Sequence, residues 1–231
     1  INATTVRLIT SVLTSEAQYT LTVGGVEDRF GNAIPAGTEY SFVARILGYR
    51  DIILADEPVA YFRFQEASGT VAVNDGTLKP TAGDGRYLTG DEPNEVEQQA
   101  KTAEGPRPPE FFGFDPVNRA ALFEANAFDW IDTGYQYLQN LGAFSLEYWV
   151  NPSGGRDADP SLWGGRVGIV GQNDAIEYGF IDPTTIQIWT PGGGALDTTY
   201  TFADDEWHHV ATIASGTDIR NYFDGELVGT G

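Results

Sequence analysis

The sequence predicts an all-β protein whose antiparallel strands pack in two layers. Apolar and polar residues alternate in many short runs, as in FSLEYWV (144–150) and TIQIWT (185–190), and this period of two is the strand pattern. The runs recur about every 8–12 residues, with Gly, Pro, Asn and Asp between them. Aromatic residues make up 13% of the chain and glycines number 28, which also favours β structure.

Composition excludes several classes of function. The 231 residues carry a net charge of −20, which would repel nucleic acid and anionic membrane surfaces. This charge suits a solvated acidic surface, bound cations or a saline exterior. The chain has no cysteine, so disulfides, zinc–thiolate sites and cysteine nucleophiles are excluded. No run approaches the roughly 18–20 apolar residues of a membrane helix. A chain that begins at Ile1 and contains no methionine is expected to be a piece of something longer.

The first 46 residues form a region of their own. TTVRLIT (4–10), AQYTLTVGG (17–25) and residues 40–44 read as strands, too few to close a sandwich. The stretch YTLTVGGVEDRFGNAIPAGTEYSFVA (19–44) resembles the C-terminal part of bacterial Ig-like domains. A linker is expected at 45–51, so the predicted domains are 1–46 and 47–231.

The larger region carries a second resemblance. Its sequence blocks, in order, are PVAYFRFQEASGTVAVNDGT, NRAALFEANAFDWIDTG, FSLEYWVNP and DDEWHHVATIASGTDIRNYFDGELVGTG. This succession is similar to laminin-G-like, concanavalin A-like jelly rolls. The resemblance implies a jelly-roll β-sandwich over 47–231, preceded by a partial Ig-like sandwich. The strand that the family places after the last hairpin is missing, which predicts an open sheet edge. Asp224-Gly225 in that hairpin predicts a type I′ turn.

Several catalytic arrangements are absent from the sequence. Neighbouring residues of a strand face opposite ways, so His208 and His209 are not expected to act together. Glycosidases of this architecture carry E-x-D-x-x-E on one strand, and no strand-like run here has that spacing. No G-x-S-x-G elbow and no phosphate loop with Lys occurs either. We therefore expect a protein that is not an enzyme.

Calcium is the one cofactor that we expect. Ca²⁺ takes six to eight oxygens from carboxylates and carbonyls near tight turns. The resemblance implies one structural calcium beside the opening strand and its loops, where Asp75 is the best match and Asn74, Glu66 and Asp56 are further candidates. A purely solvated acidic surface is the alternative.

Glycans are the ligand class that the tryptophans indicate. Sugar sites combine exposed aromatic rings with polar side chains. Trp163 and Trp189 lie near Gly-rich turns and are the candidates, although half-buried packing is the alternative for each. Trp149 and Trp207 match core positions of the family.

These observations predict a non-catalytic, extracellular adhesion, binding or structural module of a large bacterial surface or secreted protein. Its partners would be glycans or neighbouring surface-protein subunits. The alternative is a carbohydrate-binding module attached to a polysaccharide-degrading enzyme.

Overall fold

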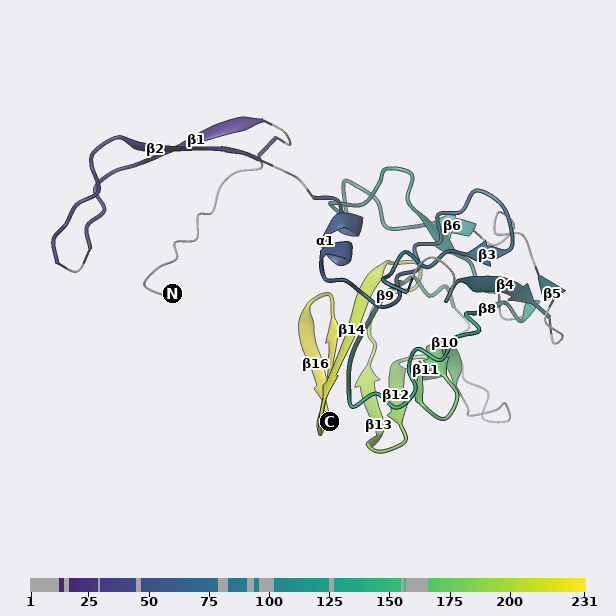
Figure 1. The fold of residues 1–231 in the computed structure, drawn as a ribbon. Helices are drawn as coiled ribbons and strands as arrows, with labels where there is room; N and C mark the ends of the chain where they lie inside the picture. Colours follow the sequence, from purple (N-terminus) through teal and green to yellow (C-terminus); the bar gives the residue numbers. More distant parts are fainter. Residues whose placement is uncertain are drawn as a thin grey trace. The chain divides into compact units, whose positions relative to one another are not determined.

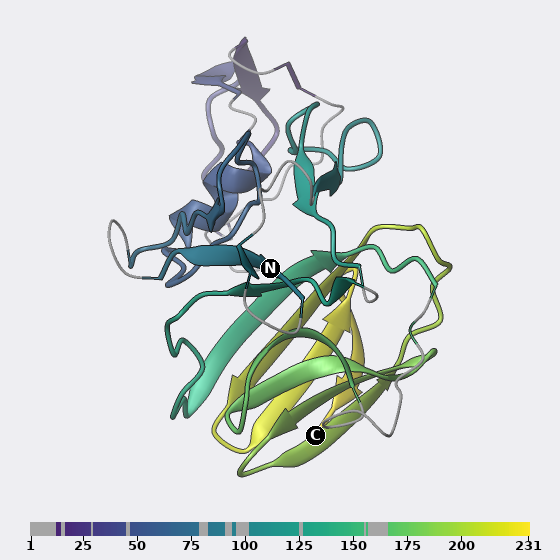
Figure 2. The ribbon, with the colours of Figure 1, turned by 90° about the vertical axis from the view of Figure 1, so that its right-hand side faces the viewer.

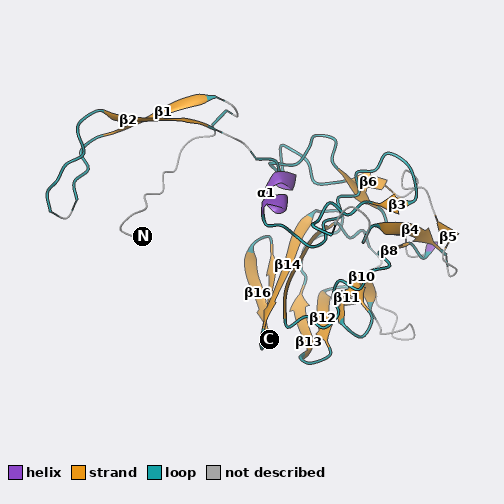
Figure 3. Cartoon of the chain, viewed as in Figure 1, coloured by secondary structure: helices purple, strands orange, loops and turns teal. Residues whose placement is uncertain are grey.

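The structure is a computed structural model that describes residues 13–14, 17–28, 30–44, 47–78, 83–90, 94–95, 102–124, 127–154, 156 and 166–231. Strands dominate it (Figures 1 and 3). The chain divides into two compact units. The first comprises Ile1–Asp56 with Arg107–Pro116, and the second comprises Glu57–Pro106 with Val117–Gly231.

The first unit contains the hairpin that the alternating pattern predicts. Strand β1 (Gln18–Val23) pairs antiparallel with β2 (Thr38–Val43), and Tyr19 stacks on Phe42 with ring centroids 5.9 Å apart. Hydrogen bonds from the Asn32 side chain and backbone and from the Phe30 amide lower the pKa of the Asp28 carboxyl in the connecting turn. The predicted strand at 4–10 lies outside the described residues.

The linker expected at 45–51 overlaps a short helix from residue 49 onward. Helix α1 (Tyr49–Ala55) begins there. The Tyr49 amide donates to the Gly113 carbonyl at 2.6 Å, and the Tyr49 ring stacks on Phe114 at 4.3 Å. The helix was missed because seven residues give little periodicity and its N-cap, Gly48, offers no side chain for capping.

The second unit is built on two antiparallel four-stranded sheets, which face each other in Figure 2. One has the order β10-β11-β12-β13, and the other has the order β16-β15-β14-β9. Their strands are β9 (Ala143–Val150), β10 (Val167–Gln172), β11 (Ile176–Asp182), β12 (Thr185–Thr190), β13 (Gly194–Thr199), β14 (His208–Ser215), β15 (Asp218–Phe223) and β16 (Glu226–Thr230).

Side chains from the facing sides of these sheets make the hydrophobic core. Tyr178, Ile186 and Ile188 come from one sheet, and Val210 and Phe223 come from the other; all five are at most 3% exposed. Aromatic rings meet edge to face between the layers, as Tyr148 and Tyr178 do at 5.5 Å. Because alternate residues of each strand face inward, the remaining residues form the two outer faces.

A buried hydrogen-bonded chain crosses this core. The Thr212 hydroxyl on β14 donates to Asn221 Oδ1 on β15, and Asn221 Nδ2 donates to the Thr198 hydroxyl on β13, both at 2.7 Å. The Tyr178 hydroxyl on β11 lies 3.1 Å from that of Thr212. The chain therefore ties the two sheets together at a fixed relative position.

Shorter strands complete the second unit. The sheet β3-β4-β5 has β8 paired with β4, and β6 pairs with β7. These strands are β3 (Val71–Ala72), β4 (Gly85–Thr89), β5 (Asn94–Glu95), β6 (Thr102–Glu104), β7 (Arg119–Ala121) and β8 (Trp130–Asp132). Residues 61–66 alternate like a strand but make only the bridge Phe62–Asn74.

The last hairpin has the predicted turn. Asp224 and Gly225 both have positive φ, 49° and 82°, as a type I′ turn requires. Among the described residues, the helical segments include none with the length and hydropathy needed to span a bilayer.

Asn221→Ala tests the chain of hydrogen bonds across the core. The substitution removes the buried partner of the Thr198 hydroxyl and one of the two partners of the Thr212 hydroxyl, and it opens a cavity, so it should lower the free energy of unfolding by about 2–4 kcal/mol. Asn173→Ala, at an exposed turn, is the control and should change it by less than about 0.5 kcal/mol. Urea unfolding measures both. Equal stability of the two variants would contradict the role assigned to Asn221.

Buried tyrosines should make the fold sensitive to alkali. Burial raises the pKa of Tyr200 from 10.0 to about 12, and it also raises the pKa of Tyr178. The unfolded chain therefore loses these protons first, so stability is complete below pH 10 and declines as the pH rises toward about 12. Urea midpoints measured from pH 9 to 12, with tyrosinate absorbance, check this. A midpoint that stays constant across that range would contradict it.

Candidate functional site

Trp189 lies on the outer face of β12, on the side of the strand away from the core. Its strand neighbours Ile186 and Ile188 are buried, so alternation turns Thr185, Gln187 and Trp189 outward. Trp189 is half-buried. The other predicted sugar-binding residue, Trp163, lies outside the described residues.

Cross-strand pairing arranges polar side chains around Trp189. Trp189 pairs with Glu177 on β11 and with Ala195 on β13. Gln187, two residues earlier on the same face, pairs with Gly179 and Asp197. We call the outward side chains of Arg166, Glu177, Gln187, Trp189 and Asp197 the Trp189 face.

The polar members of the Trp189 face are joined by hydrogen bonds. Arg166 donates to Gln187 Oε1 from Nε at 3.0 Å and from Nη2 at 2.6 Å. Its Nη1 lies 2.5 Å from Glu177 Oε2. Gln187 Nε2 donates to Asp197 Oδ1 at 2.7 Å. Three strands and the residue preceding β10 thus hold one connected network.

Two glycines of this sheet lie in close contact with the neighbouring strand. A Cβ at Gly179 would clash with the carbonyl oxygen of Val167 on the adjacent strand. A Cβ at Gly171 would lie 2.8 Å from the carbonyl oxygen of Ile176. These glycines permit β10 to approach β11 closely. An aromatic ring beside locked hydrogen-bonding groups can stack on a pyranose ring and orient its hydroxyls.

Sequence reasoning found Trp189 but not Arg166, Glu177, Gln187 and Asp197. The spacing of Gln187 and Trp189 within TIQIWT was the available signal, because residues i and i+2 share a face. The other three depend on the registers of β11 and β13, which no local pattern specifies.

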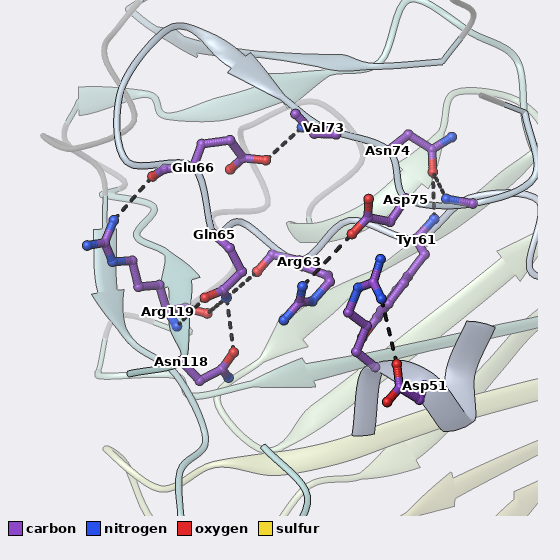
Figure 4. A network of polar contacts seen from close by, with 12 residues as sticks. Asp51, Tyr61, Arg63, Gln65, Glu66, Val73, Asn74, Asp75, Asn118 and Arg119 are labelled. Carbon is purple, nitrogen blue, oxygen red and sulfur yellow. Dashed lines mark hydrogen bonds and ion pairs between the residues drawn. The ribbon is translucent and has the colours of Figure 1, made fainter. Parts of the chain in front are cut away.

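Three of the four predicted calcium ligands, Glu66, Asn74 and Asp75, are drawn in Figure 4. Asn74 is 1% exposed, and its Oδ1 accepts the backbone N–H groups of Tyr61 and Gly76, both at 2.8 Å. Glu66 accepts the Val73 N–H on one carboxylate oxygen and the Tyr87 hydroxyl on the other, also at 2.8 Å. These oxygens fix the local backbone.

The other two predicted ligands have different surroundings. Asp75 Oδ2 lies 4.0 Å from Arg63 Nη1, and Asp56 is exposed and belongs to the first compact unit. Within the described ranges, no group of three or more His, Cys, Asp or Glu side chains is arranged to hold a metal. Calcium binding by these four residues stays a prediction.

Gln65 is a structural residue that the sequence did not reveal. Its Oε1 accepts the Arg119 N–H at 3.1 Å, and its Nε2 donates to the Arg119 carbonyl at 2.8 Å (Figure 4). The side-chain amide reproduces the pairing that a neighbouring strand would make. It therefore attaches residues 61–66 to β7 where regular strand pairing is lacking.

The two histidines lie on opposite faces of β14, as alternation predicts. His208 Nδ1 is 2.8 Å from Asp224 Oδ2, and its ring stacks on Phe202 at 3.7 Å. His209 Nε2 is 3.5 Å from Glu147 Oε2, and its ring lies against Trp149 at 5.3 Å. The two side chains therefore have separate partners.

The core position expected for Trp149 is wrong. Trp149 is in phase with Glu147 on the outward side of β9, whereas Tyr148 packs against the core. Trp149 is half-buried against His209, and Trp207 is half-buried as well. The alternation within FSLEYWV was the better guide here.

Comparison with known families supports the fold. Residues 125–231 match a laminin-G-like family described as the concanavalin A-like lectin/glucanases superfamily. Together with the antiparallel sheets, this match confirms the predicted fold class and, for this part of the chain, the jelly-roll resemblance. Comparisons with curated proteins and with solved structures gave no match. The Ig-like nature of residues 1–46 and the domain boundary stay predictions.

Calcium removal tests the predicted ion directly. If the predicted ion is bound, the melting temperature should be several degrees higher in excess CaCl₂ than in EGTA. Asn74→Ala should lower the melting temperature in both buffers, since it removes the acceptor of the Tyr61 and Gly76 N–H groups. The same melting temperature in EGTA and in calcium would contradict a structural ion.

Proposed function

We propose that this chain is a non-catalytic binding module of a multi-domain extracellular protein, and that it binds glycans on the Trp189 face. The observation that carries the proposal is the half-buried Trp189 beside the hydrogen-bonded side chains of Arg166, Gln187 and Asp197. A lectin-like role is one of the two that the family's description covers.

The contacts of this face suit sugar recognition. Pyranose rings present C–H groups that stack on an indole and hydroxyls that pair with planar amide, carboxylate or guanidinium groups. Gln187 is held from both sides, by Arg166 and by Asp197. Side chains that are ordered before binding lose less entropy when the ligand arrives.

The arrangement of carboxylates supports binding rather than cleavage. A retaining glycosidase places two carboxyl groups about 5–5.5 Å apart, and an inverting one about 6.5–9.5 Å apart. Glu177 and Asp197 lie on β11 and β13 with β12 between them, opposite Trp189 and Gln187 respectively, so their Cα atoms are about 12 Å apart. Each carboxylate is engaged with a different partner, Arg166 or Gln187.

The composition and the first unit support an extracellular, multi-domain setting. A net charge of −20 suits a saline exterior. The β1–β2 hairpin leaves Tyr40 56% exposed and Phe42 44% exposed, and a two-stranded ribbon is only marginally stable alone. We propose that this face packs against further strands of an Ig-like sandwich. Such a chain could serve an adhesin or a polysaccharide-degrading enzyme equally.

Trp189→Ala should weaken the binding of any recognised glycan by more than about tenfold, because the stacking platform is lost. A glycan array followed by calorimetry on the hits measures this. Trp130→Ala is the matched control, since Trp130 is 42% exposed on β8 in a different sheet. It should leave affinity unchanged.

The same incubations should release no new reducing ends from the bound glycans. Absence of binding by the intact protein, or equal loss in the two tryptophan variants, would contradict the proposed site. Release of sugars that depends on Glu177 or Asp197 would contradict the non-catalytic assignment.

A further inference from the structure

We infer that the Trp189 face selects uncharged glycans and rejects those bearing uronate or sulfate groups. This inference rests on the proposed function and adds the ligand's chemical class. It follows from the positions of the charged side chains on β10–β13 and from the hydrogen bonds that the Arg166 guanidinium already makes.

The segment that forms this sheet is acidic. Residues 166–200 contain a single basic residue, Arg166, and no Lys or His. The same residues contain four acidic ones, Asp174, Glu177, Asp182 and Asp197. The Trp189 face itself contains one guanidinium group, on Arg166, and two carboxylates, on Glu177 and Asp197.

Arg166 is not available to neutralise an anionic ligand. Its side chain is only 15% exposed. Nη1 lies 2.5 Å from Glu177, and Nε and Nη2 both donate to Gln187. Arginine recognises carboxylates and sulfates by directing two parallel N–H groups at them. Here Nε and Nη2, which form one such pair, are both directed at Gln187 Oε1, so an incoming acid would have to displace that bond.

Asp197 is the charge that an incoming ligand would meet. It lies on the exposed side of β13, where one carboxylate oxygen accepts from Gln187 Nε2 at 2.7 Å. Asp197 follows Ala195, the cross-strand partner of Trp189, by two residues on the same face. A sugar stacked on the indole would therefore place its substituents near this carboxylate. Hydroxyl groups can donate to it, whereas a uronate is repelled by it within the Debye length of about 8 Å.

Matched pairs of glycans test the inference, because the two members of each pair differ only at C6. The first pair is β-1,4-linked mannohexaose and β-1,4-linked hexamannuronate. The second pair is cellohexaose and its C6-oxidised form. The third pair is α-1,4-linked galactohexaose and α-1,4-linked hexagalacturonate. Calorimetry at low salt should show, for at least one pair, the neutral member bound about tenfold or more tightly than the acidic one. Trp189→Ala should abolish that binding.

Two charge variants separate the local effect from net charge. Asp197→Asn should bring the neutral-to-acidic affinity ratio several-fold closer to one. Asp182→Asn removes an equal charge at the end of β11, where Asp182 accepts the Thr184 N–H at 2.8 Å. It should leave the ratio unchanged.

Three outcomes would overturn the inference. Equal or tighter binding of the acidic members overturns the inference while the proposed glycan site stands. An equal shift of the ratio by both variants also overturns it, because selectivity would then come from net charge alone. Failure of every neutral and acidic glycan to bind overturns the proposed function and the inference together.

Discussion

The second unit depends on the attachment of two sheets to each other through one shared interior. Aliphatic and tyrosine side chains supply most of the buried area, which is the main source of stability. Such contacts are not directional. The chain from Thr212 through Asn221 to Thr198 adds direction, because its donors and acceptors are satisfied at one relative position of the sheets. Sliding the layers would leave those polar groups buried and unpaired.

This constraint also determines which side chains are available for function. Each strand of β10–β13 turns alternate residues into the shared core, so the others must face outward. Trp189 and Gln187 are outward because Ile186 and Ile188 are inward. The rigid core therefore supports the proposed binding face, where side chains need little rearrangement for recognition. Asp197, proposed to set glycan selectivity, and Trp189, proposed to supply affinity, lie on neighbouring strands of one sheet.

Much of the fold could be predicted from the sequence, and the failures have physical causes. Alternation placed the strands that contain FSLEYWV and TIQIWT and separated the two histidines, and the Asp-Gly pair predicted the turn at Asp224-Gly225. It failed at residues 61–66, where the Gln65 side chain replaces strand pairing. It also failed at α1, a helix too short to show its period.

The candidate site was found only in part, because Arg166 and Asp197 reach Gln187 through cross-strand register. The calcium ligands were inferred from a resemblance, whereas hydrogen bonds to backbone N–H groups explain Asn74 locally.

Heteronuclear NMR can test whether the outer face of β10–β13 binds glycans. Amide chemical shifts of the intact chain would be followed while a neutral oligosaccharide is titrated in. We expect the shifted resonances to cluster at residues 166–199, with the Trp189 indole N–H among the largest changes. Shifts confined to β14–β16 or to the β1–β2 hairpin would contradict it.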